Sequence, residues 1–214
     1  MVLDLTGRFA IPLKVPIAPG KSPFRVAGVV YLSLLAFIGS EAPGGLARVK
    51  AELRDPALVV FLEQRFHLAS AYDAIPLPYV GQAIARVRGV TFADQLRDSN
   101  RWSAKSRFFD VYRALVPVIS EESLTIGLAR LAKVIQPFGA LRLEIAGRHR
   151  VKGERSGVPQ ALVAWWALST SAFIETALSR IGVKSSSIAF DPPIESGREA
   201  EQLLFTMPFE LSWS

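Results

Sequence analysis

The clearest pattern along the chain is a strict alternation of apolar and polar residues near its C-terminus. Apolar side chains occupy every second position from 203 to 213, which is the period of a half-buried β-strand. These positions are Leu203, Phe205, Met207, Phe209, Leu211 and Trp213. Pro208 interrupts the strand without an N–H to donate, so it predicts a strand at a sheet edge or one with a bulge.

A shorter alternation, at positions 141, 143 and 145, predicts another half-buried strand, and Gly147 then allows a turn into a return strand over 149–153. A long helix follows from about Pro159 to Ile181 and ends at Gly182. Because this helix is apolar on nearly every side, we expect protein to cover it on more than one face. Residues 187–190 are expected to form a short strand and 191–199 a polar loop.

Start and stop signals divide the earlier part of the chain into helices. Asp55 before Pro56, Thr91 and Ser120 are typical N-caps, and Gly89 is a typical residue after a helix end. The order of elements predicts an α+β fold, in which a helical N-terminal half precedes a small antiparallel sheet of about four strands. The second half is expected to run hairpin, long helix, hairpin.

Residues 1–25 are expected to form an extended arm, and residues 26–214 a single domain. The arm mixes alternating apolar residues with prolines, which exclude a helix or a central strand. It would pack on its own domain or on a partner subunit. The apolar stretch Val26–Ile38 is shorter than the roughly 20 residues that span a membrane, so we expect no span and a cytoplasmic protein.

The composition excludes several kinds of catalytic, metal-binding and disulfide site. The 214 residues include no cysteine and two histidines, which excludes disulfides, thiolate-bound zinc, iron–sulfur clusters and thiol nucleophiles. The sequence contains no nucleophile elbow, phosphate-binding loop or dinucleotide fingerprint. We therefore expect a protein that is not an enzyme and that uses no metal or cofactor.

The formal net charge of +6 is concentrated in residues 86–113 and 142–155. These basic segments could bind nucleic acid or another polyanion, or could simply be a solvated surface. Arg155 closes the second segment. The candidate polyanion-binding residues are Arg97, Arg101, Arg107, Arg142, Arg148, Arg150 and Lys152.

Aromatic residues gather on the two longest helical segments. If these segments face each other, their rings could line an apolar cavity for a hydrophobic ligand, and plain core packing is the alternative. The candidate pocket residues are Phe108, Tyr112, Trp165, Trp166 and Phe173.

Several short motifs together resemble a known group of domains. They are Val26–Tyr31, Leu34, Leu35, Tyr72–Tyr79, Ala83–Gly89, Phe108–Tyr112, Ala172–Leu178 and Phe209–Trp213. Over about residues 26–213 the chain resembles an uncharacterised family of paralogous domains that is expanded in myxobacteria. That family is distantly similar to heme-nitric-oxide-binding (H-NOX) domains, 4-vinyl-reductase-type domains and TRAPP transport subunits. The resemblance implies a helical half, a final antiparallel sheet and homodimerisation.

The chain departs from those relatives where they bind cofactors. Heme-binding members carry a proximal histidine on a helix and a Tyr-x-Ser-x-Arg motif, and this sequence has neither. It also lacks the cysteines that hold zinc or an acyl chain in other members. The resemblance therefore implies the fold and no cofactor.

We interpret the sequence as a non-enzymatic ligand-sensing or protein-interaction module, an adaptor or signalling domain. It would form a homodimer and present an apolar pocket or an apolar dimer face to a small hydrophobic ligand or a protein partner. The alternatives are a structural protein that assembles through its N-terminal arm, a polyanion binder that uses its basic segments, and an enzyme with scattered polar catalysts.

Overall fold

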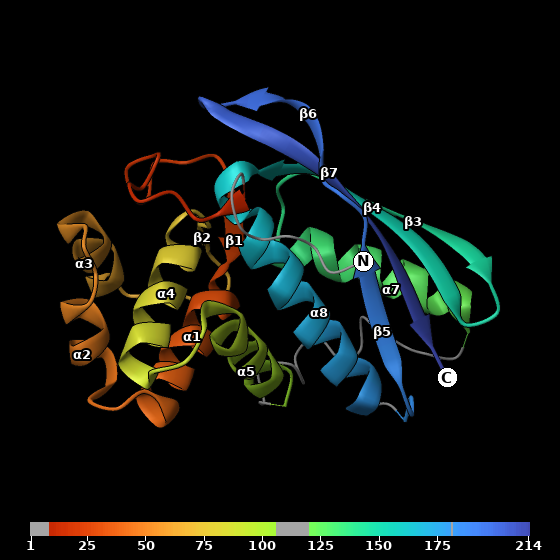
Figure 1. The fold of residues 1–214 in the computed structure, drawn as a ribbon, viewed down its shortest axis with the longest axis horizontal. Helices are drawn as coiled ribbons and strands as arrows, with labels where there is room; N and C mark the ends of the chain where they lie inside the picture. Colours follow the sequence, from red (N-terminus) through yellow and green to blue (C-terminus); the bar gives the residue numbers. More distant parts are fainter. Residues whose placement is uncertain (1–8, 106–119, 181) are drawn as a thin grey trace.

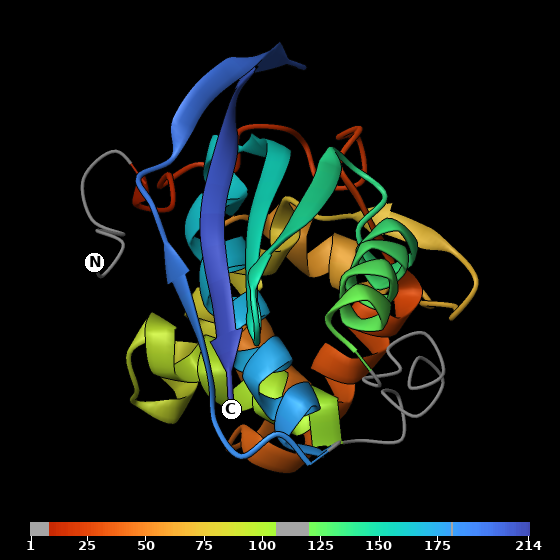
Figure 2. The same cartoon turned by 90° about the vertical axis from the view of Figure 1, so that its right-hand side faces the viewer.

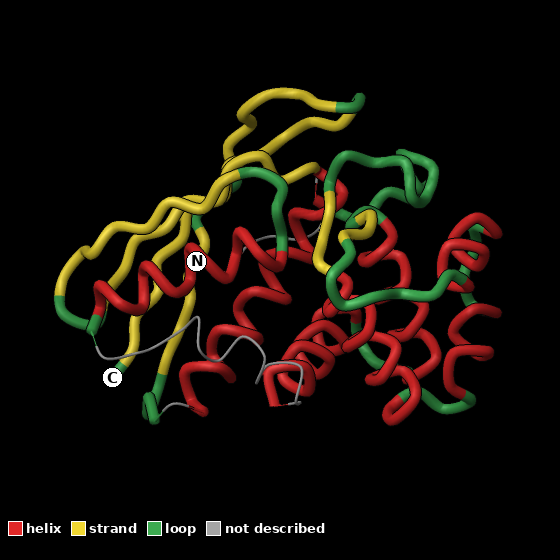
Figure 3. Tube along the Cα trace, turned by 180° about the vertical axis from the view of Figure 1, so that it is seen from behind, coloured by secondary structure: helices red, strands yellow, loops and turns green. Residues whose placement is uncertain are grey.

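The computed structural model describes residues 9–105, 120–180 and 182–214, and it has two halves that meet along one helix. Figure 1 shows a helical half on one side, a sheet on the other and helix α8 between them. The view from behind separates the same two parts, with strands gathered at one end and helices at the other (Figure 3). This arrangement confirms the predicted α+β fold.

The first half is mostly helical. Its elements are β1 (Arg25–Ala27), α1 (Gly28–Glu41), α2 (Gly45–Ala51), α3 (Pro56–Glu63), β2 (Ala71–Asp73), α4 (Pro76–Arg88) and α5 (Phe92–Lys105). The second half holds most of the strands. Its elements are α7 (Glu121–Ile135), β3 (Ala140–Gly147), β4 (Arg150–Pro159), the short helix η3 (Gln160–Leu162), α8 (Val163–Arg180), β5 (Ser186–Phe190), β6 (Ile194–Glu199) and β7 (Gln202–Trp213).

The predicted helix boundaries rest on side-chain capping. The Asp55 carboxylate accepts a hydrogen bond from the Ala57 N–H at 2.9 Å, and the Ser120 hydroxyl accepts one from the Ser123 N–H at 3.2 Å. Each bond satisfies a backbone donor that the first turn of a helix leaves free. Gly89 ends α4 in the left-handed conformation, with φ at 68°.

The buried carboxylate of Asp73 on β2 fixes the end of the N-terminal arm. It accepts hydrogen bonds from the backbone N–H groups of Gly20 at 2.8 Å, Ser22 at 3.1 Å and Ile75 at 2.9 Å, and one from the Ser22 hydroxyl. Asp73 is 0% exposed, so these bonds replace the water that a carboxylate otherwise needs. One side chain thereby joins the arm, β2 and the residues just before α4.

Earlier residues of the arm also contact their own domain. The rings of Phe9 and Phe205 form a T-shaped pair with 5.2 Å between their centroids, and the Tyr79 hydroxyl donates to the Lys14 carbonyl at 3.1 Å. The expected boundary between arm and domain at residue 25 stays a prediction.

The sheet has the order β3-β4-β7-β5, and all its pairs are antiparallel. Strand β6 pairs with the first part of β7, on the edge that β5 occupies further along. Figure 2 shows these strands side by side, with α7 next to β3. The loop expected at 191–199 is therefore partly wrong, because 194–199 form β6. All six residues of β6 are exposed, so no alternation in the sequence reveals the strand.

Pro208 lies in the central strand of the sheet, so the edge position, one of the two expected alternatives, is wrong. The other alternative, a bulge, is closer, because the β4–β7 register shifts next to Pro208, between the pairs Arg155–Met207 and Val158–Phe205, with the extra residue on β4.

The carbonyl of Pro208 accepts a hydrogen bond from the Asp191 N–H at 3.0 Å, on the side of β7 that β5 and β6 share. The N and the carbonyl of one strand residue point in the same direction. The nitrogen of Pro208, which carries no hydrogen, therefore faces the short connection between β5 and β6. Strand β5 ends at Phe190 and β6 begins at Ile194, so no strand hydrogen bond is lost there.

Helix α8 is covered on two sides, as its apolar composition predicts. Helix α5 packs along one side and strand β5 against another. The segment Gln160–Ser179 is long and apolar enough to cross a membrane, but 72% of its apolar window is buried inside the protein, as in the core helix of a globular domain.

A close approach between β4 and β7 depends on a glycine. Gly153 pairs with Phe209, and a Cβ atom at Gly153 would overlap the Phe209 ring. We expect Gly153→Ala to lower the free energy of unfolding by about 1–3 kcal/mol, because the ring must leave its place in the core. Urea unfolding measures this change.

Gly39→Ala is the matched control, because Gly39 lies on α1 with open space around its Cβ position. Alanine is the better helix former, so the control should be as stable as the wild type or slightly more stable. Equal stability of Gly153→Ala and Gly39→Ala would contradict the close approach.

Candidate functional site

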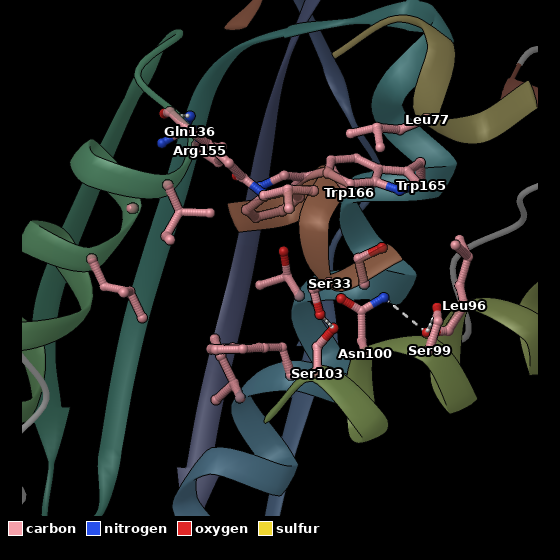
Figure 4. A pocket seen from close by; sticks show the side chains of 18 of the residues that line it. Ser33, Leu77, Leu96, Ser99, Asn100, Ser103, Gln136, Arg155, Trp165 and Trp166 are labelled. Carbon is pink, nitrogen blue, oxygen red and sulfur yellow. Dashed lines mark hydrogen bonds between the residues drawn. The ribbon is translucent and has the colours of Figure 1, made fainter. Parts of the chain in front are cut away.

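A cavity of about 190 Å³ lies where the two halves meet. Residues of α1 and α5 line it from the helical half, residues of α7, β3 and β4 line it from the other half, and α8 passes along it. Figure 4 shows Arg155 and Gln136 on one side of this space, Ser33, Asn100 and Ser103 on another, and the two tryptophans of α8 along a third.

Most of the wall is apolar. Aliphatic and aromatic side chains from α7, β3 and α8 make up the larger part of it. The principal ones are Leu128, Leu131, Ile135, Leu141, Leu143, Trp165, Phe173 and Ile174.

Arg155 supplies a positive charge at one side of the cavity. Its side chain is 2% exposed, and its Nη2 donates to the carbonyl of Gln136 at 2.9 Å and to the carbonyl of Phe138. These carbonyls follow the C-terminus of α7, the negative end of the helix dipole, which favours a cation. Burial lowers the pKa of Arg155 from 12.5 to about 10, so the guanidinium remains protonated at neutral pH. No Asp or Glu is among the described residues that line the cavity.

Gln136 joins the same side of the cavity to α8. Its Oε1 accepts a hydrogen bond from the indole Nε1–H of Trp166 at 2.9 Å. The Trp166 ring then packs against Phe190 and Phe209 of the sheet, at centroid distances of 5.7 and 6.1 Å. The end of α7, the start of α8 and the sheet are therefore held together around one wall of the cavity.

The polar residues of α1 and α5 mostly bond to one another or to their own helix. The hydroxyls of Ser33 and Ser103 share a hydrogen bond between the two helices. Ser99 and the Asn100 amide nitrogen each donate to the Leu96 carbonyl, at 3.2 and 2.8 Å. They make this side of the cavity polar without adding charge.

Three buried side-chain atoms in the described part of the chain have no hydrogen-bond partner, and the residues that carry them all line this cavity. They are Gln95 Nε2, Ser169 Oγ and Arg155 Nε. The other end of the Gln95 amide is occupied, since its Oε1 accepts from Arg88 Nη1 at 2.8 Å. Buried polar groups are usually paired with protein or with ordered water, so three groups without a protein partner around one space make it the candidate binding site.

The structure places Trp165, Trp166 and Phe173, three of the predicted pocket residues, on the cavity wall. Phe108 and Tyr112 lie outside the described residues. Sequence reasoning missed the polar groups and counted Arg155 among the basic surface residues. The sequence did contain a sign that Arg155 is buried. Arg155 lies four residues after Val151, on the same face of β4, and Val151 is buried.

The basic residues predicted to bind a polyanion lie on separate elements. Arg142, Arg148, Arg150 and Lys152 are exposed on or beside the β3–β4 hairpin, Arg97 and Arg101 are exposed on α5, and Arg107 lies outside the described residues. Two of them are in ion pairs: Arg150 contacts Glu210 at 2.8 Å and Arg97 contacts Asp94 at 2.9 Å. The pairing lowers the pKa of Glu210 and raises that of Arg150.

The fold is similar to that of several solved H-NOX domains. One is an oxygen-binding H-NOX domain related to soluble guanylate cyclases, with a TM-score of 0.60 and 10% identity over 88% of this chain and 95% of that one. Another is a variant of the T. tengcongensis H-NOX domain, with a TM-score of 0.60 and 10% identity over 88% of this chain and 97% of that one. A third, from work on H-NOX activation, has a TM-score of 0.58 and 10% identity over 87% and 94% of the two chains. No protein-family model and no curated protein sequence matches the chain. The likeness is one of fold.

A further solved structure of similar fold, with a TM-score of 0.59 and 8% identity, comes from work on heme redox potential. The cavity residues of this chain do not fit a heme. The described residues that line the cavity include no His, Cys, Met or Tyr, the side chains that bind heme iron in proteins. His67 is exposed after α3, and His149 lies in the β3–β4 turn. Within the described chain, no group of three His, Asp or Glu residues is arranged to hold a metal ion.

The bond between Gln136 and Trp166 predicts a measurable coupling between α7 and α8. Gln136→Leu leaves the indole N–H unpaired, and the free energy of unfolding should fall by about 1–3 kcal/mol. In a double-mutant cycle with Trp166→Phe, the second substitution should cost less once Gln136 is absent. Strictly additive losses in urea unfolding would show that the bond contributes nothing.

Proposed function

We propose that this protein is a non-enzymatic ligand-sensing domain that binds a small molecule in the cavity between its halves. The cavity itself carries the proposal, since it is largely apolar, bears a few polar groups and lies where two structural units meet. Ligand sites of proteins commonly have this character. The H-NOX neighbours add support from fold, because one of them is described as binding oxygen and another belongs to work on activation.

Sensing would follow from the position of the cavity. A ligand there touches α1 and α5 on one side and α7, β3 and β4 on the other. It can therefore stabilise one packing of the halves relative to another, by as much as its affinities for the two packings differ. A protein partner that contacts both halves would then bind the ligand-stabilised packing and the other packing with different affinities.

The polar groups of the cavity favour binding over catalysis. They are amides, hydroxyls and one guanidinium, all able to make hydrogen bonds. The described lining residues include no carboxylate, imidazole or lysine amine, the groups that most often perform general acid–base catalysis.

The alternatives have less support. The described part of the arm packs on its own domain through Phe9, Lys14 and Ser22, which leaves those contacts unavailable to a neighbouring subunit. The candidate basic residues of the described chain are spread over α5 and the β3–β4 hairpin, and two of them are in ion pairs. Homodimerisation, a protein partner and a cytoplasmic location stay predictions.

Filling the cavity tests the proposal. Ala132 lies on the cavity wall, and Ala132→Phe places a ring inside the space. Benzyl alcohol, a neutral probe of suitable size, should raise the melting temperature of the wild type and have little effect on this variant, because a bound ligand stabilises only the form that holds it. Native mass spectrometry of the purified wild type would also detect any ligand that co-purifies.

Ala129→Phe is the matched control, because Ala129 is half-buried on the same helix and does not line the cavity. It should respond to benzyl alcohol as the wild type does. If neither benzyl alcohol nor benzoate raises the melting temperature of the wild type, and native mass spectrometry finds no bound molecule, the cavity is not a binding site.

A further inference from the structure

We infer that the ligand of this cavity is a small organic acid with a compact apolar body and a second hydrogen-bond acceptor at its far end. The inference rests on the proposed function, since it names the chemistry of the molecule that the cavity would bind. It follows from the three unpaired buried atoms, the charge of Arg155 and the size of the space.

The unpaired atoms specify what the ligand must offer. Gln95 Nε2 and Arg155 Nε can only donate hydrogen bonds, and Ser169 Oγ can donate or accept. A molecule that satisfies all three therefore brings hydrogen-bond acceptors to two elements or more. A ligand whose polar atoms are donors only would leave Gln95 and Arg155 unpaired.

The acceptor beside Arg155 is best supplied by an anion. The guanidinium is buried, and the carbonyls of Gln136 and Phe138 that it contacts are neutral groups. No carboxylate is among the described lining residues, so the cavity has a positive charge without a matching negative one. A carboxylate on the ligand would accept from Nε and balance that charge.

The second acceptor belongs on the side of α5. Figure 4 shows the α5 residues Ser99, Asn100 and Ser103 across the cavity from Arg155, and Gln95 lines the cavity from the same helix. Because Oε1 of Gln95 already holds Arg88, its amide is oriented with Nε2 left to donate. A neutral oxygen on the ligand, an ether, carbonyl or hydroxyl, fits this donor.

Size and lining limit the body of the molecule. The cavity volume is about 190 Å³, and an apolar cavity of about 150 Å³ in another protein holds benzene. One ring with its substituents therefore fills the space, and a tetrapyrrole exceeds it. Leucine side chains of α7 and Phe173 belong to the largely apolar wall, so the body between the two polar ends is apolar.

Ordered water is the competing occupant. A buried water needs two to four polar partners, and water can satisfy the polar sides of this cavity. Most of the wall, however, is made of aliphatic and aromatic side chains that offer water no hydrogen bond. An apolar ligand body packs better against them than water does.

Calorimetric titration of the full chain with matched probes tests whether the cavity prefers an acid to a neutral or a basic ligand. Benzoate, benzyl alcohol and benzylamine have the same ring and differ in charge. We expect benzoate to bind at least about tenfold more tightly than benzyl alcohol, because its acceptor is charged, and benzylamine to bind most weakly. Equal binding of benzoate and benzyl alcohol would overturn the acid while leaving the binding site intact.

An isosteric pair of acids tests the second acceptor. Para-methoxybenzoate and para-ethylbenzoate differ only in an oxygen that replaces a methylene group. The methoxy acid should bind about threefold to tenfold more tightly to the wild type. Gln95→Glu keeps an oxygen for Arg88 and replaces the donor nitrogen by an acceptor, so it should remove or reverse that preference. An unchanged preference would refute the role of Gln95.

Ser169→Ala and Ser171→Ala form a matched pair on α8. The Ser171 hydroxyl is satisfied by the Ala167 carbonyl at 2.9 Å and does not line the cavity. Ser169→Ala deletes an unpaired group, so it should fold as the wild type does, and it should bind the preferred acid about threefold to tenfold more weakly. Ser171→Ala should bind it as the wild type does. Equal affinities of the two variants would exclude a contact to Ser169.

The outcomes separate the two proposals. If the acids fail but benzyl alcohol binds the wild type and is excluded by Ala132→Phe, the inference about the acid falls and the binding site remains. If none of these probes binds and no ligand co-purifies, the proposed function itself fails. A crystal structure grown with benzoate that shows only water at Gln95, Ser169 and Arg155 would also overturn the acid.

Discussion

Helix α8 carries apolar side chains around most of its circumference, so protein must cover it on two sides. The helices of the first half cover one side through α5, and the sheet covers another through β5 and the aromatic side chains of β7. The positions of the helical half and of the sheet follow from this requirement that α8 be covered on two sides. The helical half and the sheet are held together because each buries a different face of one helix.

The cavity arises in the same place. The helical half packs on one side of α8 through α5, and the sheet packs on another through β5. The two parts do not close the space between them. Protein interiors are normally packed to the density of organic crystals, and unpaired buried donors are costly. A space with three such groups at one junction needs an occupant, either ordered water or a ligand, and it is therefore the candidate binding site.

The comparison with H-NOX domains separates architecture from chemistry. The fold extends over nearly the whole of each compared domain at about one identical residue in ten. In the described part of this chain, the cavity wall lacks the side chains that ligate heme iron, and it presents amides, hydroxyls and one buried arginine instead. A shared fold can hold different ligands because the site depends on a few side chains, whereas the fold depends on the pattern of buried ones.

The sequence by itself determined the element order, the caps at Asp55 and Ser120, the double burial of the long C-terminal helix and the inward face of the last strand. These features are local, since each depends on neighbours within a few residues or on the period of apolar positions. Tertiary structure decided the rest. Strand β6 has no apolar face and exists only because β7 offers it a partner, and Pro208 is tolerated in a central strand only where β5 gives way to β6. The site is of the same kind: Gln95, Arg155 and Ser169 look like ordinary polar residues in sequence, and they become a set only when three distant elements surround one cavity.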